Sequence, residues 1–178
     1  MNVKKTMMKA IILFSAMCFV TGCGEEKREE IPKEEVKGNC VVTECIKQME
    51  ATSTKEEISE IIGFEPEVSE FSGEMTWKLD KKNWITLKPG TDSQILQATI
   101  DKETIKDENI TLPSQKELQE LLNKGVTYEQ LVEKIGGEGT LNSKTSGSVG
   151  YLWVDKNGQR LGATINNKSG KCTVASYR

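Results

Sequence analysis

Two similar stretches of this chain, 73 positions apart, constrain its fold more than any other feature. The second is TYEQLVEKIGGEGT (Thr127–Thr140) and the first is TKEEISEIIGFEPE (Thr54–Glu67). In the second copy, Thr127 and Gln130 have the spacing of a helix capping box, in which each satisfies a backbone amide near the helix start. Gly136 supplies the left-handed residue that commonly ends a helix. The stretch therefore predicts one short helix.

The first copy follows the same pattern, with Thr54 and Glu57 as the capping box and Gly63 as the stop. A further capping box, Ser114 with Glu117, precedes the second copy and predicts another short helix there. Helices of about nine residues are marginally stable alone, so they must pack on something else. The repeat therefore predicts two pairs of helices, each supported by a larger element.

Segments with strand-like alternation follow each helix pair at an offset of 76. They are Glu74–Asp80, Asn83–Pro89 and Ile95–Asp101 in the first half, and Val149–Asp155, Gln159–Asn166 and Lys171–Tyr177 in the second, with possible extra strands near Val68 and Leu141. The positions expected to face the core are Ile85, Leu87, Leu96 and Ala98, matched by Leu161, Ala163, Cys172 and Val174. The predicted fold class is α+β, with two tandem helix-loop-helix plus antiparallel-sheet units at residues 39–106 and 107–178.

The stretch GVTYEQLVEKIGGEGT, the aromatic strand YLWVD, the Asn157-Gly158 turn and the final VASY together resemble the β-lactamase inhibitor protein family and its lipoprotein relatives. The resemblance covers about Gly38–Tyr177 and is stronger in the second half. It implies tandem units, each a helix–loop–helix packed on an antiparallel sheet. No inhibitor contact residue can be matched to this chain, so inhibition is only an alternative expectation.

The N-terminus predicts export and lipidation. A basic segment precedes the 11 apolar residues Ala10–Val20, which are too few to span a bilayer and fit a signal peptide. Val20–Cys23 resembles a bacterial lipobox, which implies removal of residues 1–22 and a diacylglyceryl group on the Cys23 thiol. Residues 23–38 are rich in Glu and Lys and predict an extended tether. An ordinary secretory signal with a chance cysteine, and a fraying helix in the tether, are the alternatives.

Charge and composition exclude several function classes. Removing residues 1–22 changes 24 basic against 27 acidic residues to 21 against 27, a net charge of −6 that opposes nucleic-acid binding. The chain has no histidine, which excludes Ser-His-Asp and Cys-His catalysis. The Gly136–Gly139 run ends a helix and lacks the Lys-Ser/Thr of a phosphate loop. We expect no catalytic residue, no metal site, no cofactor besides the covalent lipid, and no small-molecule substrate.

Three cysteines remain after the lipidated one, and an exported compartment permits disulfides. Cys40 and Cys45 can pair if the chain bends sharply before a helix, and either can instead pair with Cys172. Sequence does not choose among these pairings. A buried thiol is the simplest interpretation of Cys172.

In a two-layer unit, helices cover one sheet face and leave the other open. Residues out of phase with the core positions are expected on that open face. The candidate partner-binding residues are Trp84, Lys88, Trp153, Arg160 and Tyr177, with Thr86, Thr164 and Thr173 beside them. Trp, Tyr and Arg dominate interface energetics, which favours binding. Alternatively, Trp84 and Tyr177 cover sheet edges or a seam between the halves, and a one-residue shift would bury Trp77 with Leu79.

These expectations together predict a non-enzymatic lipoprotein on the extracytoplasmic face of a cell membrane, which binds an unknown protein or peptide through an open sheet face. The alternatives are an inhibitor of a β-lactamase or other cell-wall enzyme, and an envelope assembly factor.

Overall fold

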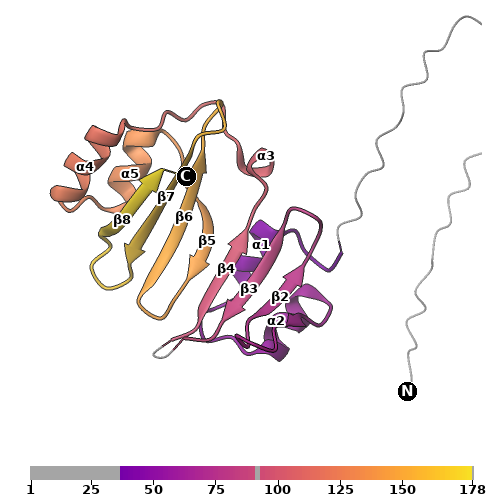
Figure 1. The fold of residues 1–178 in the computed structure, drawn as a ribbon. Helices are drawn as coiled ribbons and strands as arrows, with labels where there is room; N and C mark the ends of the chain where they lie inside the picture. Colours follow the sequence, from indigo (N-terminus) through magenta and orange to yellow (C-terminus); the bar gives the residue numbers. More distant parts are fainter. Residues whose placement is uncertain (1–36, 91–92, 178) are drawn as a thin grey trace, which may run out of the picture. The chain divides into compact units, whose positions relative to one another are not determined.

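The computed structural model describes residues 37–90 and 93–177, and the predicted signal peptide, Cys23 and most of the tether lie outside them. The described residues form one antiparallel sheet of eight strands with five helices (Figure 1). In chain order the elements are α1 (Val42–Gln48), α2 (Lys55–Ile62), β1 (Glu67–Val68), β2 (Met75–Lys78), β3 (Trp84–Lys88), β4 (Ile95–Thr99), α3 (Lys102–Ile105), α4 (Gln115–Asn123), α5 (Tyr128–Ile135), β5 (Thr140–Lys144), β6 (Ser148–Val154), β7 (Arg160–Asn166) and β8 (Cys172–Tyr177). The α+β prediction is confirmed, and both suspected extra strands are present as β1 and β5.

Each strand of the sheet pairs with its neighbours in the sequence, in the order β1 to β8. β4 and β5 join the two halves of the sheet through two residue pairs, Leu96 opposite Lys144 and Gln97 opposite Ser143. The Lys144 side chain also reaches α1, where its ammonium donates to the Met49 carbonyl. The sheet is thus continuous from the first half to the second.

The helices begin and end where the capping signals predict. Thr54, Ser114 and Thr127 each form a capping box. In each box, the side chain of the residue three positions later accepts a hydrogen bond from the backbone amide of the capping residue. Gly63 and Gly136 end α2 and α5 in the left-handed conformation, with φ of 97° and 89°. These local bonds set the helix ends before any tertiary contact is considered.

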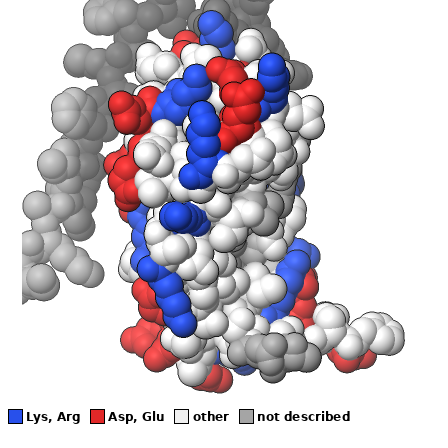
Figure 2. Space-filling view, turned by 90° about the vertical axis from the view of Figure 1, so that its left-hand side faces the viewer, with Lys and Arg blue, Asp and Glu red and all other residues white. Residues whose placement is uncertain are grey.

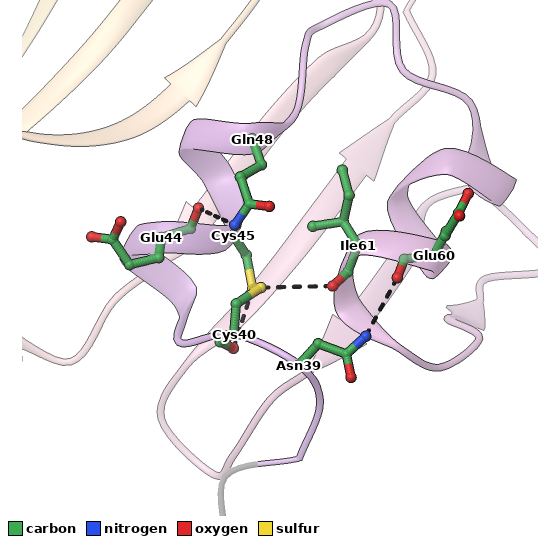
Figure 3. Close-up of a disulfide and its surroundings, with 7 residues drawn as sticks. All are labelled: Asn39, Cys40, Glu44, Cys45, Gln48, Glu60 and Ile61. Carbon is green, nitrogen blue, oxygen red and sulfur yellow. Dashed lines mark hydrogen bonds between the residues drawn. A yellow bond between two sulfur atoms is a disulfide. The ribbon is translucent and has the colours of Figure 1, made fainter. Parts of the chain in front are cut away.

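Helix α1 is the exception, because it has no side-chain cap. Its N-cap position is Val41, which lies at the 73-residue offset from Ser114 of α4. Here the structure joins Cys40 and Cys45 in a disulfide, with the two Cα atoms 5.6 Å apart (Figure 3). The bond closes the first turn of α1, so a covalent link stands where the equivalent helix has a hydrogen-bonded cap.

The same segment contacts the end of α2. The Asn39 backbone amide donates to the Ile62 carbonyl at 2.8 Å, and the Cys40 sulfur lies 3.8 Å from the Ile61 carbonyl oxygen (Figure 3). A disulfide sulfur carries no proton, so this last approach is a contact and not a hydrogen bond. Cys172, the remaining described cysteine, is buried in β8 outside this bond.

Two hydrophobic clusters underlie the sheet, one in each half. The first joins α1 and α2 to β2, β3 and β4, and the second joins α4 and α5 to β6, β7 and β8. Seven of the eight expected core positions are buried, namely Ile85, Leu87, Leu96, Ala98, Leu161, Ala163 and Cys172. The eighth, Val174, pairs with Thr164 and not with the core residue Ala163. Trp77 and Leu79 are buried together, as the shifted register predicted.

Candidate binding face

All four longer helices pack on the same face of the sheet, which we call the helix face. The register shows this, because Leu96, Lys144, Val149, Ile165 and Cys172 lie side by side across β4 to β8. Leu96 belongs to the first cluster, and Ile165 and Cys172 belong to the second. Residues opposite in an antiparallel pair share a face, so both clusters lie on one side. The other side is the open face, and α1 and α2 lie behind β2–β4 in Figure 1.

The central positions of the open face carry small or uncharged polar side chains. Thr76, Thr86, Gln97, Ser143 and Thr164 form one row across β2 to β7, with Gly150 of β6 between the last two, and Ser176 lies in β8. Leu152 of β6 is the buried apolar residue beside them. An antiparallel sheet with one packed face and one polar face alternates in this way. The composition indicates a surface that can hydrogen-bond a partner without strong charge.

A shallow depression of about 80 Å³ crosses the open face from β4 to β8. Gly150 and Gly162 line it, with the polar side chains of Gln97, Ser143 and Thr164. A Cβ atom on Gly150 would lie only 2.1 Å from the Ser143 Oγ, so the hollow depends on this glycine. Small-molecule pockets are usually several hundred Å³, so this hollow fits one protruding side chain.

Two of the expected partner-binding residues, Trp84 and Lys88, lie on the open face in β3. Trp84 is half-buried opposite Thr99, and Lys88 lies opposite Ile95, which is 39% exposed. The Lys88 ammonium forms a 3.8 Å ion pair with Glu74. Between them Thr86 is buried, so Trp84 and Lys88 form a more exposed rim around a closed centre.

The assignment of Trp153 to the partner-binding set is wrong. Trp153 is 2% exposed and lies on the helix face, opposite Leu161. Its indole Nε1 donates to the Gly137 carbonyl at 2.9 Å. The sequence left the phase of Trp153 open, because a one-residue shift moves every side chain of a strand to the other face, and the register decides it in favour of the helix face.

The assignment of Tyr177 to the open face is also wrong, and a β-bulge is the reason. Thr164 pairs with Val174 while Ile165 pairs with Cys172, so Thr173 is an extra residue in β8. Beyond such a bulge the alternation of faces is reversed. Tyr177 consequently lies opposite Leu161 and packs against the second cluster, where burial raises the pKa of its hydroxyl.

Arg160 alternates with Leu161 and so lies on the open-face side of β7, as expected, but it is four strands away from Trp84 and Lys88 in β3. It pairs with Val154 at the start of β7 and lines a groove with Ser114, Gln115 and Tyr177 beside the start of α4. Among the described residues, no carboxylate forms an ion pair with it. The structure therefore assembles only Trp84 and Lys88, of the five expected residues, into one surface.

One exposed aromatic residue was missed by the sequence prediction. Phe71 is fully exposed in the loop between β1 and β2, where Gly73 donates its amide to the Ser69 carbonyl at 2.9 Å. The signal was a lone phenylalanine between Glu70 and Ser72 in a segment with no apolar alternation. Its phenyl ring is accessible to a partner.

The described residues contain no group of three or more His, Cys, Asp or Glu side chains arranged to hold a metal ion. None of the helices within 37–90 and 93–177 is long and apolar enough to cross a membrane. Comparison of the chain with protein-family models, curated proteins and solved structures finds no match.

Proposed function

We propose that this chain is a lipoprotein, anchored through Cys23 on the extracytoplasmic side of a membrane, that binds a protein or peptide through its open face without catalysing a reaction. The observation that carries the proposal is the open face itself, a polar surface that extends over both halves and has a glycine-lined hollow. The hollow accepts one side chain, while Trp84 and Lys88 lie on the same face in β3. Tryptophan is enriched among the residues that dominate interface energetics, and polar side chains commonly surround them.

The test is recovery of a stoichiometric partner from solubilised envelope on the immobilised full-length chain. Trp84→Ala and Lys88→Glu are expected to lower recovery at least tenfold, because truncation of an interface anchor costs several kcal/mol. Lys47→Glu, on the exposed side of α1, is the matched control and should leave recovery unchanged. Equal recovery by all variants would reject the open face as the binding surface.

The anchor has its own test, since it depends on Cys23 and not on the fold. Mass spectrometry of the membrane fraction should find the chain beginning at Cys23 with two or three acyl chains attached. An intact chain with an unmodified Cys23 thiol would reject the anchor and leave the binding proposal to stand on the open face alone.

We also infer that the two halves are tandem units, each a helix–loop–helix packed on an antiparallel sheet. The resemblance to the β-lactamase inhibitor protein family implies such units. Support comes from the element order, which is two helices followed by four strands in each half, with α3 between them. Trp77 and Trp153, 76 positions apart, are the two largest fully buried side chains, one in each cluster.

Inhibition of an enzyme is the second candidate function, and exposed Phe71 favours it. A protruding aromatic side chain on a tight loop is shaped to enter a cleft of a partner. Micromolar full-length protein should then inhibit a β-lactamase or a cell-wall enzyme, and Phe71→Ala should weaken inhibition. No inhibition across such a panel would remove this candidate.

A further inference from the structure

The two edges of the sheet differ in how they are protected against pairing with another strand. β1 has only two residues, follows Pro66, and carries Glu67, whose carboxylate pairs with Lys78 at 2.6 Å. Short length, proline and charge are the usual protections of an edge strand. β8 has six residues, Cys172–Tyr177, without proline or any charged side chain. β8 therefore lacks the protections that β1 has.

The chain itself already uses the start of this edge. Thr127 forms an antiparallel bridge with Lys171, and the Cys172 amide donates to the Val126 carbonyl at 2.8 Å. The position beside β8 is thus occupied by Val126 and Thr127 at one end. Further along, within the described residues, β7 is the only strand that pairs with Thr173–Tyr177. The backbone N–H and C=O groups of these residues that point away from β7 are therefore available for hydrogen bonds to another strand.

A groove of about 330 Å³ lies beside this part of the edge. One wall is formed by Ala175, Ser176 and Tyr177 of β8, and the other by α4. The α4 residues that line it are Gln115, Leu118, Gln119 and Leu122. Their spacing of i, i+3, i+4 and i+7 is one helical face, and it carries no charge. Figure 2, which views the side that carries α4 and β8, shows a largely uncharged area between charged ends.

Arg160 supplies a positive charge where the groove continues past Tyr177. It lines a second hollow of about 640 Å³ with Gln115, Glu117 and Tyr177. The Glu117 carboxylate is already engaged by Lys134 at 3.0 Å and by the Ser114 amide at 2.8 Å. The Arg160 guanidinium has no such partner among the described residues, and a planar guanidinium binds carboxylates well.

We propose that the edge of β8 binds an extended segment of a partner protein as a ninth strand, in the groove beside α4. The segment carries uncharged side chains along Thr173–Tyr177 and a carboxylate that reaches Arg160. Backbone hydrogen bonds supply affinity in this mode, and the pockets beside alternate side chains supply specificity. This site shares Ser176 with the open face but does not depend on the open-face proposal.

Charge argues against a second copy of this chain as the occupant. In an antiparallel β8–β8 pair, Lys171 of one copy would approach the Tyr177 end of the other, where Arg160 lies. Basic groups would face each other there, and like charges across paired strands are destabilising. A segment with an acidic end has the complementary charge.

The experiment uses the full-length chain in detergent and two pools of octapeptides. In both pools the six central positions vary among Val, Ile, Thr, Ser and Ala; both terminal residues are glutamates in one pool and lysines in the other, so that either strand direction brings a charge to Arg160. The glutamate pool should be retained at least tenfold more than the lysine pool, and the retained peptides should slow hydrogen exchange of the Thr173–Tyr177 amides. Equal retention, or protection confined to other strands, would overturn the proposal.

Variants then test the two named contacts. Arg160→Gln should weaken binding of a retained peptide about tenfold, whereas Lys168→Gln, which removes the same charge from the exposed β7–β8 turn, should not.

Gln119 is exposed in α4, so Gln119→Glu should weaken binding and Gln119→Lys should strengthen it without affecting folding. Trp84→Ala on the open face should have no effect. Concentration-dependent dimerisation that competes with the peptide would assign the edge to a second copy and also overturn the proposal.

Discussion

Trp77 and Trp153 lie 76 positions apart on the helix face of the two halves, yet their indole N–H groups donate to different kinds of acceptor. Trp77 Nε1 donates to the Ser59 Oγ in α2 at 3.2 Å, and Trp153 Nε1 donates to the Gly137 carbonyl after α5 at 2.9 Å. Both rings are almost completely buried. A buried indole N–H needs a partner, and the two halves provide it with a side chain in one case and with the backbone in the other.

Ser59→Ala should therefore destabilise the protein by about 1–3 kcal/mol, because it leaves the Trp77 N–H buried without an acceptor. Urea denaturation followed by tryptophan fluorescence measures the change. In the double variant with Trp77→Phe the additional cost of Ser59→Ala should largely disappear, since the donor is then absent. A cost below about 0.5 kcal/mol in the wild-type background would contradict this role for Ser59.

Gly139→Ala should destabilise the protein by about 1–3 kcal/mol through overpacking. A Cβ atom there would lie 2.6 Å from the Trp153 ring, and Trp153 is held in place by its bond to Gly137. Gly147→Ala is the matched control, because no atom lies within 4 Å of its added Cβ. Thermal unfolding of both variants measures the difference, and equal melting temperatures would reject the packing argument.

Loss of the Cys40–Cys45 disulfide should lower stability by about 2 kcal/mol, the chain-entropy estimate for so short a loop. The Cys40→Ser, Cys45→Ser double variant tests this by urea denaturation. Reductant should bring the wild type to the level of the double variant and leave the variant itself unchanged. Insensitivity of the wild type after complete reduction would mean that hydrogen bonds alone hold the start of α1.

Stability should depend on Glu117 in acid. The hydrogen bonds from Ser114, the backbone amide first, and the ion pair with Lys134 lower the pKa of Glu117 to about 2 from its ordinary 4.5. Because the folded-state pKa is the lower one, the stabilisation is present above pH 4.5 and is lost as the pH falls from there to about 2. Glu117→Gln should flatten the stability profile in that window. Glu120→Gln, an exposed neighbour in α4, should not, and an unchanged slope in Glu117→Gln would contradict the assignment.

The helix ends and the buried strand positions could be predicted from the sequence because they depend on local chemistry. A threonine or serine three residues before Glu or Gln can satisfy the backbone amides of a helix start through contacts within four residues, and a glycine ends the helix by its own left-handed conformation. The caps at Thr54, Ser114 and Thr127 needed no knowledge of the rest of the chain. Likewise, Ile85 and Leu87 alternate with polar neighbours and lie in the core.

The candidate site was predicted less well, because a face assignment depends on every residue between two positions. One extra residue at Thr173 turned Tyr177 from the open face to the helix face. The phase of Trp153 in β6 stayed open for the related reason that a strand can be shifted by one position without changing its composition. Neither the bulge nor the shift has a local signal in the sequence.

The sequence by itself determined the helix caps, the α+β class and the residue types available for binding, since these follow from neighbours along the chain. Only the tertiary structure decided which cysteines meet, which face each aromatic residue occupies and which sheet edge is left unprotected. Those properties are set by the register between strands and by the contact of α4 with β8, which join residues distant in the chain. The β8 edge shows the difference, because an uncharged strand becomes a binding surface only when it is the last strand of a sheet.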